Sequence, residues 1–190
     1  MSKKRILAAI PIALLPYFAL FAPATLFLST KCPFFRWVME SVFRGNALYL
    51  TAVFFLCCFL VAALSAVCFL VSICKKWDSL SLAKIFMIVK LLQVPAYVLI
   101  FACGVLFSIT IFTVPFSVAL LFSDCVSVFS TGLGVASAAI NAIRQDIFKP
   151  KEILWVIIAQ FVFCADVVAS MILYIKLKNR KADTQKQTRN

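Results

Sequence analysis

The stretch ALYLTAVFFLCCFLVAALSAVCFLVSIC, from Ala47 to Cys74, decides the fold class. It contains no charged residue in 28 positions. As an α-helix it would measure about 42 Å at 1.5 Å per residue, which exceeds the ~30 Å hydrocarbon core of a bilayer. The stretch therefore predicts a transmembrane helix that tilts or projects beyond the hydrocarbon core.

The composition of the whole chain agrees with this stretch. Of the 190 residues, 64% are hydrophobic and 14% are charged, and the mean hydropathy is +1.06. Soluble domains are about 45–50% apolar and about 25% charged. A soluble domain of this size cannot bury so much apolar surface, because its surface-to-volume ratio is too high. We therefore expect an integral membrane protein.

Further apolar runs lie on both sides of this helix. The first is longer than the ~7–15-residue core of a signal peptide, so we expect a retained span. Residues 91–143 carry a single charge and are too long for one span, and Pro115 marks the turn because it disfavours helix at the residue before it. The predicted spans are Ile6–Ser29, Ala47–Cys74, Ser81–Ser108, Pro115–Ile143 and Ile153–Tyr174.

The linker Thr30–Asn46 has a helical pattern of its own. Arg36, Glu40 and Arg44 recur every four residues, which places them on one helical face. Pro33 suits the first turn of a helix. The pattern predicts an amphipathic helix in the headgroup region, with an irregular loop as the alternative.

The number of spans is where two rules disagree. Five spans leave nine Lys and Arg residues on each side of the membrane, whereas four spans leave twelve inside and six outside, which the positive-inside rule prefers. Hydropathy favours five. We predict an all-α polytopic transmembrane helical bundle with five membrane-embedded helices. The alternative is four spans plus a re-entrant hairpin, formed by residues 115–131 and turning at Gly132-Leu133-Gly134.

Residues 1–178 are expected to form a single transmembrane helical domain, followed by a disordered polar tail at residues 179–190. The small residues between Gly132 and Ala142 indicate close helix packing. Seven of the eight cysteines lie in or at the edge of apolar runs, no Cys-x-x-Cys pair is present, and the chain has no histidine. We therefore expect no zinc site, no other metal and no cofactor.

Ionisable residues inside the predicted spans are the candidate functional residues. Burying one charge in the hydrocarbon costs at least ~2.5–3.5 kcal/mol. That cost falls if Lys90 meets Asp124 or Asp166. The functional interpretation is a proton- or cation-linked site, and the alternatives are a structural clamp between helices or a snorkelling Lys90. The candidate intramembrane polar site comprises Lys90, Gln93, Asp124, Gln160, Asp166 and Ser170.

Several function classes are disfavoured. The sequence has no Gly-x-Ser-x-Gly elbow, no P-loop and no pair of carboxylates in an aqueous loop, so we do not expect an enzyme. The net charge of +12 comes from basic residues at the ends of apolar runs. That placement indicates lipid headgroups and topology, and not nucleic acid.

Two stretches, KLLQVPAY at residues 90–97 and QFVFCADV at residues 160–167, carry a resemblance. Together they resemble a family of small, uncharacterised multi-pass membrane proteins of Gram-positive bacteria. The resemblance implies a bacterial plasma membrane and no particular activity.

Two functions remain open. The first is an accessory or interaction subunit that packs in the plane of the membrane against another membrane protein, because the chain is small and has minimal loops. The second is a small transporter or channel component, because charged residues lie within the spans. The lipid bilayer is the expected partner in both cases, and the sequence does not predict an oligomeric state.

Overall fold

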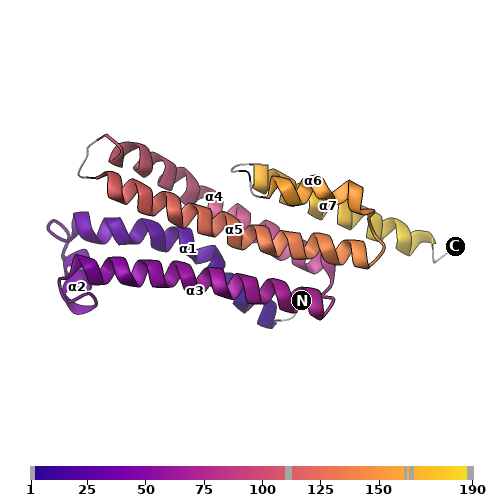
Figure 1. The fold of residues 1–190 in the computed structure, drawn as a ribbon, viewed down its shortest axis with the longest axis horizontal. Coiled ribbons are helices and arrows are strands. Elements are labelled where there is room, and N and C mark those ends of the chain that lie inside the picture. Colours follow the sequence, from indigo (N-terminus) through magenta and orange to yellow (C-terminus); the bar gives the residue numbers. More distant parts are fainter. Residues whose placement is uncertain (1–2, 110–112, 161, 163–164, 188–190) are drawn as a thin grey trace. The chain divides into compact units, whose positions relative to one another are not determined.

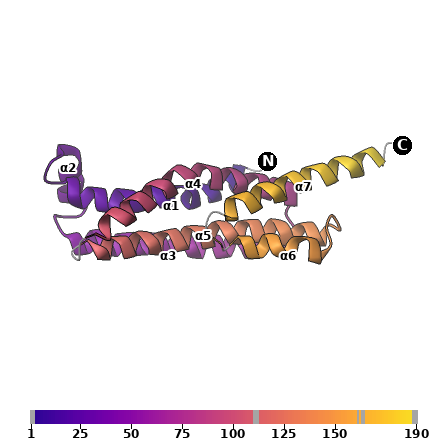
Figure 2. The ribbon, with the colours of Figure 1, turned by 90° about the horizontal axis from the view of Figure 1, so that it is seen from above.

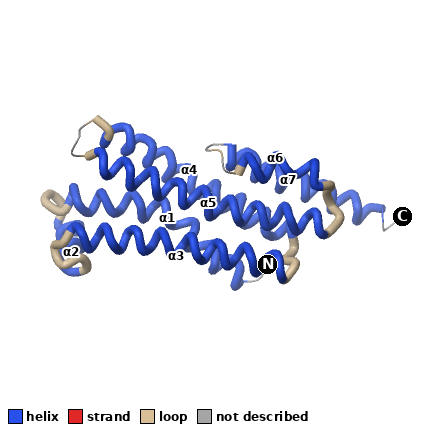
Figure 3. Tube along the Cα trace, viewed as in Figure 1, coloured by secondary structure: helices blue, strands red, loops and turns tan. Residues whose placement is uncertain are grey.

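The structure is a computed structural model, and it describes residues 3–109, 113–160, 162 and 165–187. Every regular element among these residues is an α-helix (Figure 3). The elements, labelled in Figure 1, are α1 (Lys3–Leu28), α2 (Pro33–Ser41), α3 (Ala47–Cys74), α4 (Ser79–Phe107), α5 (Val114–Arg144), α6 (Pro150–Ala159) and α7 (Ala165–Gln187).

Four of these helices are long and apolar enough to cross a membrane. They supply the candidate spans Ile6–Leu28, Ala47–Cys74, Ser79–Phe107 and Val114–Arg144. These spans match the first four predicted ones to within two residues at each end. The chain is therefore an all-α, multi-pass membrane protein.

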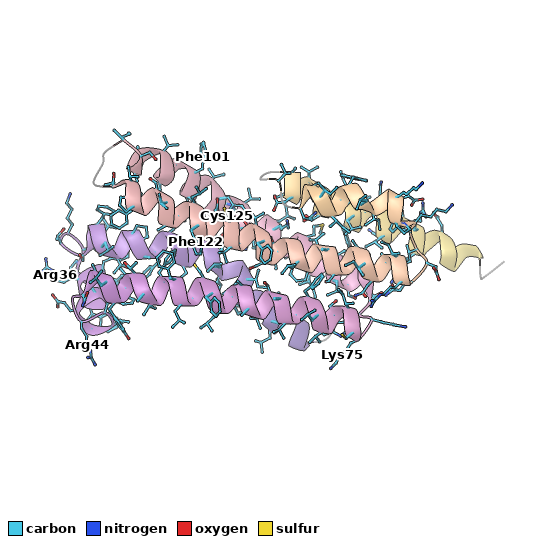
Figure 4. All side chains as sticks on the ribbon, in the orientation of Figure 1. Arg36, Arg44, Lys75, Phe101, Phe122 and Cys125 are labelled. Carbon is cyan, nitrogen blue, oxygen red and sulfur yellow. The ribbon has the colours of Figure 1, made fainter. Side chains whose placement is uncertain are left out.

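The outer faces of these helices are apolar. The Leu48 side chain is 80% exposed and Phe59 is 70% exposed, both on α3. On α4 the Phe101 ring, labelled in Figure 4, is 68% exposed. Isolated exposed apolar residues are normal in soluble proteins, but so dense a set needs lipid as its solvent.

The predicted fifth span, Ile153–Tyr174, is wrong as a single helix. Residues 150–159 form α6, which at ten residues is only about 15 Å long, and α7 begins at Ala165. Lys176 of α7 lies over the ring of Trp155 in α6, and Arg180 pairs with Glu152. Residue numbers thus rise along one helix as they fall along the other. The two helices form an antiparallel hairpin (Figures 1 and 2).

The alternative hairpin, predicted at residues 115–131, is also wrong. Helix α5 continues without a break through Gly132-Leu133-Gly134. A Cβ atom on Gly134 would lie 2.2 Å from Cε1 of the Phe86 ring, so this position needs glycine to let α4 approach. The glycine serves close helix packing, as the run of small residues indicated.

A helix in the first linker is confirmed as α2 (Pro33–Ser41), but Arg44 lies beyond its end and so does not share the helical face of Arg36 and Glu40 as predicted. Cys32 precedes it in extended conformation, and Pro33 occupies the first turn. The helix ends before Arg44, where positive φ angles at Arg44 (52°) and Gly45 (69°) turn the chain. Arg36 donates hydrogen bonds to the carbonyls of Ser29 and Thr30. Figure 4 shows Arg36 and Arg44 projecting from this segment.

The chain divides into two compact units. Unit 1 comprises Met1–Ala13, Ala63–Leu92 and Val128–Asn190, and unit 2 comprises Leu14–Ala62 and Gln93–Ser127. Helices α1, α3, α4 and α5 contribute to both, whereas the α6–α7 hairpin belongs to unit 1. Helix α7 continues past Asn179, where the sequence placed the start of the tail, to Gln187.

The core of unit 2 is apolar and aromatic. Leu50 of α3 and Leu120 of α5 are almost fully buried. The ring of Phe27 lies 5.2 Å from that of Phe107 and 5.0 Å from that of Phe116, centroid to centroid. Such offset aromatic contacts add about 0.5–1.5 kcal/mol beyond burial.

In unit 1, hydrogen bonds join the connections at one end. Gln145 accepts a hydrogen bond from Ser79 at 2.9 Å and donates one to the Trp77 carbonyl at 3.1 Å. Arg180 of α7 donates to the Ile147 carbonyl at 2.9 Å. The α3–α4 connection, the α5–α6 connection and the later part of α7 therefore lie at the same end of this unit.

Candidate functional site

A fully buried ion pair lies at the centre of the candidate site in unit 1. The Nζ atom of Lys90 lies 2.6 Å from Oδ2 of Asp166, and the two residues are 0% and 1% exposed. Lys90 is the twelfth residue of α4, about 16 Å from the start of the helix. Its ammonium group is thus held by Asp166 deep along the helix and does not snorkel to a surface.

Asp166 lies in the first turn of α7, directly after the hairpin's reversal. Its Oδ1 atom accepts a hydrogen bond from the backbone N–H of Val167 at 2.8 Å, while Oδ2 accepts from Lys90. The N-terminal end of a helix carries partial positive charge, which stabilises a carboxylate there. The break between α6 and α7 therefore gives Asp166 a second stabilising interaction that an unbroken span would lack.

The energetics of such a pair favour a structural role. A buried ion pair contributes little net stability relative to apolar residues of the same volume. Removal of only one partner costs about 3–5 kcal/mol, because the other charge stays buried alone. The pair joins the first turn of α7 to α4.

Gln160 and Ser170 belong to the same unit, but among the described residues neither bonds to the pair. The Gln160 side chain is 0% exposed and donates to the Val156 carbonyl at 3.3 Å. Its Oε1 atom has no hydrogen-bond partner among the described residues. Ser170 donates to the Val167 carbonyl of its own helix at 2.7 Å.

Gln93 and Asp124 lie in unit 2. Gln93 accepts a hydrogen bond from the Tyr97 hydroxyl at 2.9 Å, and that hydroxyl lies 3.0 Å from the Ser127 hydroxyl. Gln93 thus belongs to a second buried polar cluster, in which sequence reasoning missed Tyr97 and Ser127. The i, i+4 spacing of Gln93 and Tyr97 was the available signal. Asp124 is 8% exposed and is not the carboxylate that binds Lys90.

A further polar contact in unit 1 was also missed. Asn141 of α5 is fully buried and donates to the carbonyl and the hydroxyl of Ser72 in α3, at 3.1 and 3.2 Å. A cavity of about 20 Å³ has a mainly apolar lining that also includes serines of these helices, among them Ser65, Ser130 and Ser137. This volume holds about one water molecule. Neither Lys90 nor Asp166 lines the cavity.

Metal-binding geometry is not found in the part of the chain that the structure describes. No group of three or more His, Cys, Asp or Glu side chains there could hold an ion. The seven described cysteines are free thiols. Cys164 lies outside the described residues.

Outside the spans, an ion pair joins α7 to the α3–α4 connection. Lys181 pairs with Asp78, which also accepts two hydrogen bonds from Ser81. Partial burial alone would raise the pKa of Asp78, but the bonds from Lys181 and Ser81 outweigh it, so the pKa lies below the ordinary 3.8.

Comparison with known proteins adds no assignment to these sites. No protein-family model, no curated protein and no solved structure matches this chain.

Proposed function

We propose that the chain is an accessory subunit that packs in the plane of the plasma membrane against another membrane protein. The observation that carries this proposal is the closed state of the Lys90–Asp166 pair. Its two charges are bonded directly to each other and are buried from solvent. Two charges that neutralise each other in this way support a role in helix packing. A transport site instead needs a charged group that an ion or a proton can reach.

Cavity volumes support the same proposal. The cavity in unit 1 measures about 20 Å³, and one in unit 2, lined by Leu50 and Leu120 among others, measures about 40 Å³. Each has room for one or two water molecules. Neither Lys90 nor Asp166 lines either of these two cavities.

The orientation in the membrane follows from the positive-inside rule once α6–α7 is treated as a hairpin that enters and leaves on one side. Four spans then place both termini on the same side. That side carries fifteen Lys and Arg residues: three from Lys3 to Arg5, three from Lys75 to Lys84, three between Arg144 and Lys151, and six from Lys176 onward. The other side carries three, Lys31, Arg36 and Arg44. We therefore propose that both termini are cytoplasmic.

The proposed membrane is a bacterial plasma membrane. The resemblance of residues 90–97 and 160–167 to membrane proteins of Gram-positive bacteria supports this location. The first of these stretches contains Lys90 and the second contains Asp166, so both partners of the buried pair lie in the stretches that carry the resemblance.

A small transporter or channel component is the second candidate. It is favoured by the hairpin, because broken helices whose ends lie at membrane depth form ion sites in many transporters. The N-terminal end of α7 and the carboxylate of Asp166 lie at such a break. In this alternative, Lys90 and Asp166 would separate during transport.

A pair of experiments tests the two candidates. The full chain is purified in mild detergent with its associated proteins, and it is also reconstituted into vesicles for a pH- and ion-dependent flux assay. The variant is the double substitution Lys90→Met with Asp166→Leu, which removes both charges and keeps an apolar contact. An accessory subunit retains a stoichiometric partner in this variant. Flux in the wild type that the double variant abolishes would instead support the transporter.

A further inference from the structure

We propose that a groove at the open end of the α6–α7 hairpin binds the phosphate of an anionic phospholipid headgroup. The groove has a volume of about 480 Å³ and is lined by Phe148, Glu152, Trp155, Lys176, Asn179 and Arg180. The inference rests on the proposed membrane orientation, which places this end at the cytoplasmic leaflet. A bound anionic phospholipid goes beyond the accessory role, which does not by itself require a ligand.

Lys176 provides a positive charge that no described carboxylate neutralises. Its Nζ atom lies 5.6 Å from the centroid of the Trp155 ring, and none of the ion pairs among the described residues includes it. The cation–π contact holds the ammonium in place at the groove without cancelling its charge. An anion that entered the groove would meet an available cation there.

Arg180 gives the groove a second cation in a fixed position. Its guanidinium group pairs with Glu152 at 3.0 Å, donates to the Ile147 carbonyl at 2.9 Å and lies 4.7 Å from the centroid of the Phe148 ring. The lining thus carries two cations against one carboxylate, a net charge of +1, and Asn179 adds an amide donor. Preorganised guanidinium and ammonium groups are the usual recognition elements for phosphate.

The placement of the groove favours a lipid phosphate over a free one. Lys176 directly follows the apolar run of α7 that ends at Ile175, so it lies where a helix leaves the hydrocarbon. Trp155 is 43% exposed, and tryptophan concentrates at the headgroup level of membranes. Anionic lipids of the cytoplasmic leaflet attract basic residues at this depth. The aromatic rings would contact the glycerol region while the cations hold the phosphate.

The test compares two lysines of one helix. The full chain is reconstituted into nanodiscs of phosphatidylcholine doped with phosphatidylglycerol, and the enrichment of phosphatidylglycerol around the protein is measured by native mass spectrometry. Lys176→Gln should lower this enrichment about tenfold, because it removes a directed charge-assisted contact with the lipid phosphate and not only general surface attraction. Lys178→Gln removes an exposed charge two residues away, outside the groove lining, and should leave the enrichment unchanged. Lys176→Arg should restore most of the wild-type enrichment.

The other possible outcomes contradict the groove site, the assignment of the phosphate to a lipid, or the proposed membrane function. Equal losses in Lys176→Gln and Lys178→Gln would contradict a groove site and indicate general surface attraction. Displacement of the lipid by soluble glycerol phosphate at comparable concentration would contradict the lipid assignment. A chain that incorporates into nanodiscs without Lys176-dependent enrichment refutes only this inference, whereas a chain that fails to incorporate refutes the proposed membrane function.

Discussion

Lys90 of α4 and Asp166 of α7 are 76 positions apart in the sequence, yet their side chains meet at 2.6 Å in full burial. The contact forms because the chain reverses between α6 and α7, which brings the first turn of α7 against the middle of α4. Burying either charge alone in the membrane would be costly, and the pairing of the two charges lowers that cost. The proposed function rests on this contact as a clamp between α4 and the hairpin, which is tested below.

The glycine at position 134 should be intolerant of any side chain. Gly134→Ala places a Cβ atom 2.2 Å from the Phe86 ring, so α4 and α5 must separate or the ring must leave its rotamer. We expect a loss of about 1–3 kcal/mol, typical of overpacking, in the free energy of unfolding measured in mixed micelles.

Gly104→Ala is the matched control for that substitution. Gly104 also lies within a long helix, but a Cβ atom added there would meet no neighbouring side chain or helix within 4 Å, so only helix propensity changes. The variant should be neutral or more stable by up to about 1 kcal/mol. Equal effects of the two substitutions would contradict the packing role of Gly134.

Stability should depend on the ionisation of Asp78 at acid pH. The pKa of Asp78 is lower in the folded state than in the unfolded chain, because Lys181 and Ser81 bind its carboxylate. The stabilisation is therefore complete above the ordinary pKa of 3.8 and is lost as pH falls through the lower folded value. Unfolding measured at a series of pH values below about 5 should show this loss in the wild type. Asp78→Asn should reduce the acid-dependent part, and an unchanged pH profile would contradict the pair.

Both termini should lie on the same side of the membrane, opposite the connection that contains α2. A reporter active only in the cytoplasm, fused after Asn190, should be active, and the same reporter inserted after Gly45 should be inactive. If the fusions after Gly45 and after Asn190 were both inactive, residues 150–187 would cross the membrane once. That result would contradict the hairpin.

The sequence was sufficient for the fold class because hydrocarbon imposes a simple requirement. A run such as Ala47–Cys74 must be helical to satisfy its backbone, so its bounds could be predicted to the residue. The break between α6 and α7 could not be predicted in this way. Residues 153–174 are mostly apolar and contain neither glycine nor proline, so local signals favour an unbroken helix.

Long-range contacts identify the hairpin instead. The reversal of the chain allows three contacts between residues that are far apart in the sequence, so no local sequence pattern predicts them. They are Arg180 with Glu152, Lys176 with Trp155 and Lys90 with Asp166. At Gly132-Leu133-Gly134 the alternative prediction placed a turn where the helix is unbroken. Glycine suits both a turn and a close helix contact, so the sequence alone does not distinguish them. Burial cost did identify Lys90 and Asp166 as candidates, but it could not indicate that Gln93 belongs with Tyr97.

The most direct measurement of the central claim is a double-mutant cycle on Lys90 and Asp166, read as the free energy of unfolding in mixed micelles. Lys90→Met and Asp166→Leu alone should each cost about 3–5 kcal/mol, because each leaves one buried charge unpaired. Together they should restore most of the wild-type stability, while Ser170→Ala, one turn further along α7, removes one buried hydrogen bond and should cost no more than about 1.5 kcal/mol. Additive losses in the double variant would contradict a clamp formed by these two residues.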